Sequence, residues 1–211
     1  MTADATVSPR SYGGRSVADR KAERRARFLD AGLTVFAERT YANSTISDVC
    51  AAAGLSRRQF YEEFRDREHL LTALYDSIFA DNRTAIAQAL TAAPSGDIRR
   101  IADVAMRALV ESVGTDPRRA QVAFVEVVGV SAAMEAHRAQ SREEWVRFFE
   151  ALVRTYFPDA IEPPGGWRLA GTAFVGAVTY IVHQWAVESP RGPVEPLVGI
   201  LVTILVALAQ S

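Results

Sequence analysis

Three neighbouring side chains, Arg57, Arg58 and Gln59, offer several hydrogen-bond donors within one short segment. An arginine guanidinium forms a bidentate pair with the O6 and N7 acceptors of guanine, and a glutamine amide forms one with adenine. Ser56 stands directly before them, and serine is a favoured helix N-cap, so these side chains should project from the first turn of a helix. Such donors at a helix start are suited to reading base edges in the major groove of double-stranded DNA.

Two short helices joined by a tight turn must position these donors. Thr45 is a second N-cap, and Asp48 three residues later can complete a capping box with it. Gly54 can adopt the left-handed backbone conformation that closes the first helix, and the second runs from Ser56 to about Phe64. The sequence therefore predicts a helix-turn-helix.

The pattern around these helices matches a family motif. The motif combines two capped helix starts, a small-residue and glycine turn, a Tyr-x-x-Phe pair and a basic-Glu-x-Leu-Leu helix start. It is present here as Thr45, Ile46, Asp48, Val49, Ala53, Gly54, Leu55, Ser56, Tyr61, Phe64, Arg67, Glu68, Leu70 and Leu71. On these residues, the segment 20–71 resembles the DNA-binding domain of the tetracycline-repressor family.

The resemblance implies a dimeric, ligand-responsive transcriptional repressor that binds operator DNA. The expected DNA-binding residues are Thr45, Ser56, Arg57, Arg58, Gln59, Tyr61 and Arg67. The three donors after Ser56 are expected to contact base edges, whereas Thr45, Tyr61 and Arg67 are expected to hold phosphates. Arg58 occupies a position often held by glycine in the family, so the recognition surface should be bulkier than usual.

Helical periodicity continues along most of the chain, and strand or hairpin signals are absent. We expect an all-α fold of about nine helices, in which a three-helix head is followed by a larger helical body. The predicted domains are a flexible arm over 1–19, a helix-turn-helix domain over 20–65, and a ligand-binding and dimerisation domain over 66–211. The expected helices span about 20–39, 45–54, 56–64, 66–90, 97–113, 117–129, 131–156, 167–188 and 193–209.

The last two helices carry more apolar surface than one protomer needs. The segment 193–209 is apolar nearly all round, although an amphipathic surface helix would have a polar face. The segment could be a central helix of the core, or a second copy of the protein could cover its outer side. Its position at the end of the chain favours the second explanation. In the resembled family these helices form a four-helix dimer interface. We therefore expect a homodimer through about 167–188 and 193–209, which arginine at Gly176 or Leu201 should disrupt.

Aromatic and flexible residues of the middle helices could line a pocket for a mostly apolar effector. The expected lining residues are Phe79, Met106, Phe124, Phe148, Phe149, Phe174 and Tyr180, with Glu126 and His183 as polar anchors. A filled core without any ligand is the alternative. The helix over 66–90 joins the head to this pocket, so a bound effector could move the two heads of a dimer away from the spacing that DNA requires.

Composition and charge narrow the function classes. The net charge of the chain is −1, but residues 1–67 carry 12 Lys and Arg against 9 Asp and Glu. This segment is therefore positively charged, as expected of a head that binds DNA. No apolar run reaches the ~20 residues of a membrane span, and the N-terminus does not resemble a signal peptide. We therefore expect a cytoplasmic protein without membrane association.

Catalytic and metal-binding patterns are absent from the sequence. The three histidines are scattered, and Cys50 is the single cysteine, which suits a buried small residue better than a reactive thiol. We expect no cofactor, no metal and no enzymatic activity. The alternative function is a helical small-molecule-binding protein, or an enzyme, without DNA-binding activity.

Overall fold

The computed structural model describes residues 16–92 and 97–210, and within these ranges it contains helices and no strands. The predicted all-α fold is thus confirmed. Most of the predicted arm, residues 1–15, lies outside the described residues. The head consists of α1 (Val17–Arg39), α2 (Ile46–Ala53) and α3 (Arg57–Glu63). The body consists of α4 (Arg67–Ala92), α5 (Ile98–Gly114), α6 (Pro117–Ala120), the π-helical segment η1 (Gln121–Glu126), α7 (Ala132–Tyr156), α8 (Gly166–Val187) and α9 (Glu195–Ala209).

The first helix begins three residues earlier than predicted because of a capping box at Ser16. The Ser16 hydroxyl accepts a hydrogen bond from the Asp19 backbone N–H at 3.0 Å, and the Asp19 carboxylate accepts one from the Ser16 backbone N–H at 3.0 Å. Two otherwise unsatisfied donors of the first turn are thereby paired. Helix α1 therefore begins at Val17, inside the segment predicted as a flexible arm.

The helix-turn-helix has the predicted caps. Thr45 and Asp48 form a capping box at the start of α2, and Ser56 forms one at the start of α3. Gly54 has a φ of 61° and a ψ of 37°, the left-handed conformation in which an L side chain is strained. Its N–H reaches the carbonyl oxygens at the end of α2, which closes that helix.

An aromatic cluster holds the three head helices together. Phe28 of α1 meets Phe60 of α3 edge to face, with ring centroids 5.4 Å apart, and Phe64 at 6.2 Å. All three rings are at most 1% exposed. Burying rings of this size fixes the position of α3 on α1.

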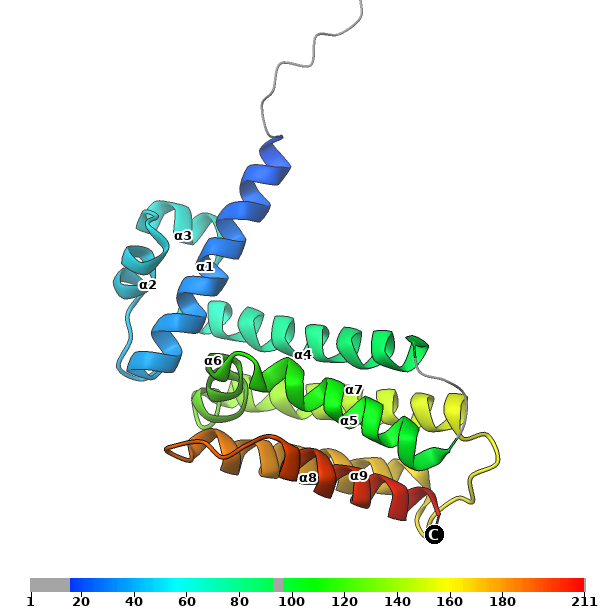
Figure 1. Ribbon diagram of the computed structural model, residues 1–211. Helices are drawn as coiled ribbons and strands as arrows, with labels where there is room; N and C mark the ends of the chain where they lie inside the picture. Colours follow the sequence, from blue (N-terminus) through cyan, green and yellow to red (C-terminus); the bar gives the residue numbers. More distant parts are fainter. Residues whose placement is uncertain (1–15, 93–96, 211) are drawn as a thin grey trace, which may run out of the picture.

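The body helices are arranged in layers (Figure 1). The helix α4 lies next to the head, α5 and α7 lie beneath it, and α8 and α9 form the side farthest from α4. Helix α5 packs against both α4 and α9, and α7 packs against α8. No helix in the described part of the chain is long and apolar enough to cross a membrane.

The regular helix predicted over 117–129 is wrong in its second half. After one turn of α6 the backbone widens into η1, and the Val128 N–H bonds the carbonyl of Val125. The Phe124 carbonyl instead accepts a hydrogen bond from Nδ1 of His183 at 2.9 Å. The periodicity of the sequence could not reveal this exchange, because His183 comes from the distant helix α8.

The proposed use of Leu201 to disrupt a dimer is also wrong. Leu201 is fully buried in the core of its own protomer, so arginine there would unfold the body. The glycines of α8 also differ in whether they face the core of their own protomer. A Cβ at Gly171 would lie 2.9 Å from the Phe149 ring, so Gly171 serves packing within the protomer, whereas a Cβ at Gly176 would meet no atom within 4 Å.

Candidate nucleic-acid interface and apolar cavity

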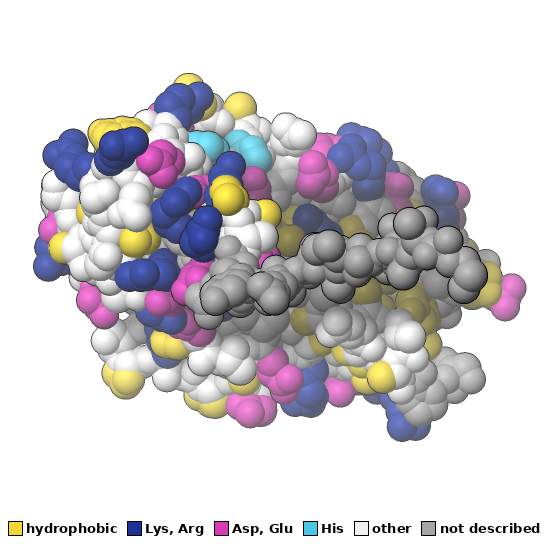
Figure 2. All heavy atoms as spheres, turned by 90° about the horizontal axis from the view of Figure 1, so that it is seen from above, with side chains coloured by type: hydrophobic (Ala, Val, Ile, Leu, Met, Phe, Trp, Pro, Cys, Tyr) yellow, Lys and Arg dark blue, Asp and Glu magenta, His cyan; other side chains and the backbone are white. Residues whose placement is uncertain are grey.

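The first turn of α3 presents two exposed arginines. The Arg58 side chain is 90% exposed, and its ion pair with Glu62 is long at 3.5 Å. Arg57 is also exposed, with one long contact of 3.5 Å from Nη1 to the Ser47 hydroxyl. Viewed from above, several Lys and Arg side chains face outward over the head, with acidic ones between them (Figure 2). Both guanidinium groups of α3 are therefore available to an external partner.

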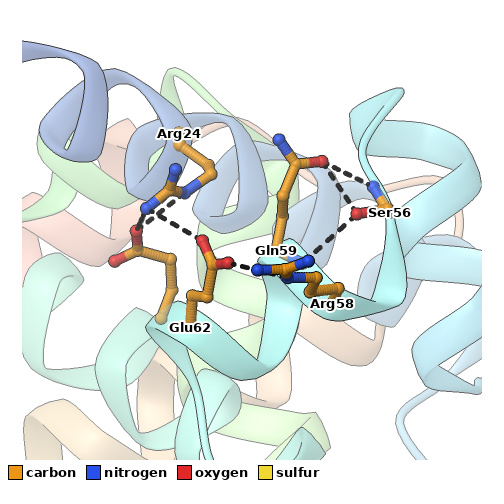
Figure 3. Close-up of polar contacts among 6 residues, drawn as sticks. Arg24, Ser56, Arg58, Gln59 and Glu62 are labelled. Atoms are coloured by element: carbon orange, nitrogen blue, oxygen red, sulfur yellow. Dashed lines mark hydrogen bonds and ion pairs between the residues drawn. The ribbon is translucent and has the colours of Figure 1, made fainter.

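Gln59 has a different role in this geometry. Its Oε1 accepts hydrogen bonds from the Ser56 backbone N–H at 2.9 Å and from the Ser56 hydroxyl at 3.0 Å (Figure 3). A bidentate contact to adenine needs both the oxygen and the nitrogen of the amide. While this cap is intact, Gln59 has only its Nε2 to offer a base. Arg58 is thus better placed for base contact than Gln59.

Two arginines of α1 hold the helix-turn-helix in place. Arg24 pairs with the nearly buried Glu63 at 2.6 Å and reaches Glu62 at 3.5 Å (Figure 3). Arg27 donates to the Ala53 carbonyl at 2.6 Å, at the end of α2. These guanidinium groups therefore serve the internal structure of the head.

Arg67 and Thr45, both predicted to hold phosphates, already have partners. The Arg67 guanidinium lies over the Tyr41 ring, 4.1 Å from its centroid, and donates to the Ser44 carbonyl. The Thr45 hydroxyl donates to the Asp48 carboxylate at 2.7 Å. By contrast, Tyr61 is 52% exposed on α3. Arg67 thus shapes the loop before α2, and its contact with DNA stays a prediction.

Cys50 is buried in the head, as predicted. Its burial raises the pKa of the thiol, against a smaller opposing effect of Arg57. A thiol with a raised pKa is a weak nucleophile, which fits a packing role.

An apolar cavity of about 90 Å³ lies in the body. It is lined by residues of α4, α5, η1, α7, α8 and α9. Six of the predicted lining residues are there, namely Phe79, Met106, Phe124, Phe148, Phe149 and Phe174. The sequence had suggested these aromatic residues without showing which of them converge.

The other three predicted lining residues lie elsewhere. Tyr180 is 65% exposed on α8. His183 is bonded to the Phe124 carbonyl, and Glu126 accepts from the Tyr41 backbone N–H at 2.7 Å. Neither predicted polar anchor lines the cavity, because each is engaged in holding η1.

Sequence reasoning missed the polar residues that do line the cavity. They are Tyr75, Arg138, Arg142 and Thr179. Arg138 and Arg142 are four residues apart, so they share one face of α7. Arginines at this spacing are common on solvated helix faces, and only the packing of α4 and α8 shows that this face borders a cavity. Within residues 16–92 and 97–210, no group of three or more His, Cys, Asp or Glu could hold a metal ion.

The structure thus combines a helix-turn-helix head, with α3 exposed and capped, and a helical body that contains a cavity. Residues 28–74 match the family described as "Bacterial regulatory proteins, tetR family". In residues 28–74, which include the helix-turn-helix, the chain is therefore similar to the tetR family of bacterial regulators.

Among curated proteins, the chain is 25% identical over 129 residues to the HTH-type transcriptional repressor DhaR of Mycobacterium sp. (strain GP1). The match covers 61% of this chain and 65% of that relative, so it spans less than two thirds of the relative's length.

Solved structures share the fold. The fatty acid degradation regulator FadR of Bacillus halodurans superposes with a TM-score of 0.74 at 18% identity, over 86% of this chain and 94% of that one. FadR of Bacillus subtilis, solved in complex with stearoyl-CoA, has a TM-score of 0.72 at 16% identity, over 87% and 98% of the two chains. These likenesses extend across both the head and the body.

Proposed function

We propose that this regulator represses transcription as a homodimer and that a small, mostly apolar molecule releases it from its operator. The observation that carries the proposal is the pairing of an exposed recognition helix with a cavity in the same chain. Arg57 and Arg58 are available to DNA on α3, and α4 leads from the head to the cavity lining. The curated relative DhaR is a repressor, and FadR of Bacillus subtilis binds stearoyl-CoA, a ligand with a long apolar chain.

The surface of α8 and α9 supports dimerisation. Helix α8 has no Asp, Glu, Lys or Arg between Leu169 and Val187, and α9 has none after Glu195. The exposed residues of these uncharged stretches include Leu169, Thr172, Ala173, Gly176, Tyr180, Gln184, Val187, Gly199, Ile200, Thr203 and Ala207. An uncharged face of large apolar and small residues fits a symmetric helix-packing interface.

The release mechanism follows from the connections between head and body. Two heads must lie about 34–36 Å apart to enter successive major grooves. A ligand that prefers a body with a shifted α4 would change this spacing, and it would lower DNA affinity by no more than its preference between the two states. In this proposal residues 20–65 bind DNA and residues 66–211 bind the ligand and the second protomer. The protein acts on cytoplasmic DNA and does not catalyse a reaction.

The proposal is tested by a mobility-shift assay with the full-length protein and the DNA upstream of its own gene. We expect a retarded band that survives an excess of unrelated competitor DNA. A band lost to the competitor, or no band at all, would support the alternative of a helical binding protein or enzyme without specific DNA binding.

A further inference from the structure

Helix α7 brings two arginines to the cavity, and their partners differ. Arg138 is nearly buried, and its Nη1 lies 2.7 Å from both carboxylate oxygens of Glu135, which neutralises it. Arg142 is half-buried and also lines the cavity. In the described part of the chain it has no hydrogen bond or ion pair. The cavity therefore borders one guanidinium that forms no ion pair, although the charge of Arg142 also acts on the Glu135 carboxylate that Arg138 binds.

The other polar groups of the cavity lining also favour a ligand that carries a hydrogen-bond acceptor. Among the described residues, no Asp or Glu lines the cavity. Trp145 lines the cavity, and its indole Nε1 is buried without a hydrogen-bond partner in the described residues. An indole N–H can only donate, so a ligand acceptor would remove an unfavourable state of the empty protein. Thr179 adds no free donor, because its hydroxyl bonds the Val175 carbonyl at 2.8 Å.

Tyr75 belongs to the same end of the cavity. Burial raises the pKa of its phenol, opposed by a hydrogen bond with Ser141 and by the charges of Arg138 and Arg142. The phenol therefore stays protonated at neutral pH and adds no negative charge to the cavity.

Beyond Arg142 the α7 lining is aromatic or aliphatic, and its polar atoms are the Trp145 indole N–H and the Tyr156 hydroxyl. The α7 residues that follow along the cavity are Trp145, Phe148, Phe149, Leu152, Val153 and Tyr156. A helical rise of about 1.5 Å per residue places Tyr156 about 21 Å along α7 from Arg142. The cavity lining thus has a cationic end and a long apolar remainder.

We propose that the cavity binds an organic acid with an extended apolar body, whose carboxylate lies at Arg142 and whose chain lies along α7. This inference rests on the proposed function, of which it specifies the effector class. A carboxylate supplies the ion-pair partner that Arg142 lacks and an acceptor within the same region as the Trp145 indole. A cationic ligand would face the unpaired guanidinium at low dielectric, and a neutral one would leave it unpaired.

The test compares ligands of one chain length by isothermal titration calorimetry at about pH 7.5, with the full-length protein. The probes are decanoate, 1-decanol, decyltrimethylammonium and decanoyl-CoA. We expect decanoate to bind at least about tenfold more tightly than 1-decanol, and decyltrimethylammonium most weakly. Equal or tighter binding of the alcohol or the ammonium compound would overturn the proposal, as would binding of none of the four. Tighter binding of decanoyl-CoA than of decanoate would overturn the carboxylate assignment in favour of a phosphate-bearing thioester.

Variants of the cavity lining test which residues cause the preference for decanoate over 1-decanol. Arg142→Gln should abolish the preference for decanoate over 1-decanol without weakening 1-decanol binding, and Trp145→Phe should reduce it in part. Arg147→Gln removes an exposed arginine of α7 that does not line the cavity, and it should leave the preference intact. A preference that persists in Arg142→Gln would overturn the assignment. If circular dichroism shows that Arg142→Gln is misfolded, Arg142→Lys replaces it and should retain the preference for decanoate. Loss of that preference in an Arg142→Lys variant with a native spectrum would contradict the charge argument.

Operator binding in the absence of any probe is measured on the same preparations. If DNA binding fails while decanoate binds as expected, the proposed regulatory function fails and the ligand class stands. If DNA binding succeeds and decanoate does not bind, only the ligand class fails.

Discussion

The Glu126 carboxylate accepts a hydrogen bond from the Tyr41 backbone N–H at 2.7 Å and thereby joins the body to the head. Its second oxygen accepts from Nε2 of Gln121 at 2.9 Å. The Oε1 of Gln121 in turn accepts from Arg191, between α8 and α9, at 3.3 Å. A line of polar contacts therefore runs from the end of α1 through η1 to the proposed dimer side. It joins head and body in addition to the continuous chain at α4 and to Arg118 of α6, which donates to the Thr34 hydroxyl of α1 at 2.7 Å.

The first prediction concerns this connection. Glu126→Ala should lower the free energy of unfolding by about 1–3 kcal/mol, because it leaves the partly buried Tyr41 N–H without an acceptor. It should also reduce the effect of a bound ligand on DNA affinity, since the head is held less firmly to η1. Urea unfolding and DNA titrations with and without ligand measure the two effects. Glu111→Ala, which removes an exposed carboxylate of α5, is the matched control. Unchanged ligand response in a destabilised Glu126→Ala would limit Glu126 to a structural role.

The second prediction concerns the dimer. Gly176→Arg and Ile200→Arg place a charge on the uncharged face of α8 and α9, and both should give folded monomers with weakened operator binding. Gln88→Arg adds the same charge at an exposed site of α4 and should remain dimeric. Sedimentation velocity distinguishes the two states, and a wild-type monomer at micromolar concentration would contradict the interface. Leu201→Arg should instead fail to fold, because Leu201 is fully buried.

The third prediction separates two roles of Arg67. Lysine keeps the charge that a phosphate contact needs but cannot stack as a plane on Tyr41. If the main role is to shape the loop before α2, Arg67→Lys should lower stability by about 1 kcal/mol and weaken binding to all DNA sequences alike. Thermal unfolding and DNA titration test this, with Arg65→Lys at the exposed neighbouring site as the control. Unchanged stability and DNA affinity in Arg67→Lys would favour a phosphate contact alone.

Local chemistry was predictable from the sequence, and long-range geometry was not. Thr45, Gly54 and Ser56 act on residues within three or four positions, so their types and spacing were sufficient to predict the two helices and the turn. At η1 the Phe124 carbonyl bonds His183, about 60 positions away, and no local pattern encodes this contact. The same limit applies to the cavity, because Arg142 borders it only through the way α7 packs among its neighbours.

Helix α9 shows, within one helix, what the sequence could not predict. The sequence indicated correctly that α9 is apolar on all sides, but it did not show which residues face the protomer's own core. Leu201 faces inward and its neighbour Ile200 is 47% exposed. Assigning these faces requires the position of α5, which packs against α9.

The central claim is that α3 reads a DNA sequence, and fluorescence anisotropy with Arg58→Ala tests it most directly. The wild-type protein and the variant are titrated with labelled upstream DNA and with a scrambled duplex of the same composition. We predict that Arg58→Ala loses about 1–3 kcal/mol on the upstream DNA, and much less on the scrambled duplex, because a base contact contributes only at its own sequence. Arg107→Ala removes an exposed arginine of α5 and should change neither affinity. Equal losses on both duplexes would reduce Arg58 to a non-specific charge, and no difference between the duplexes for the wild-type protein would contradict the account of α3 as a recognition helix.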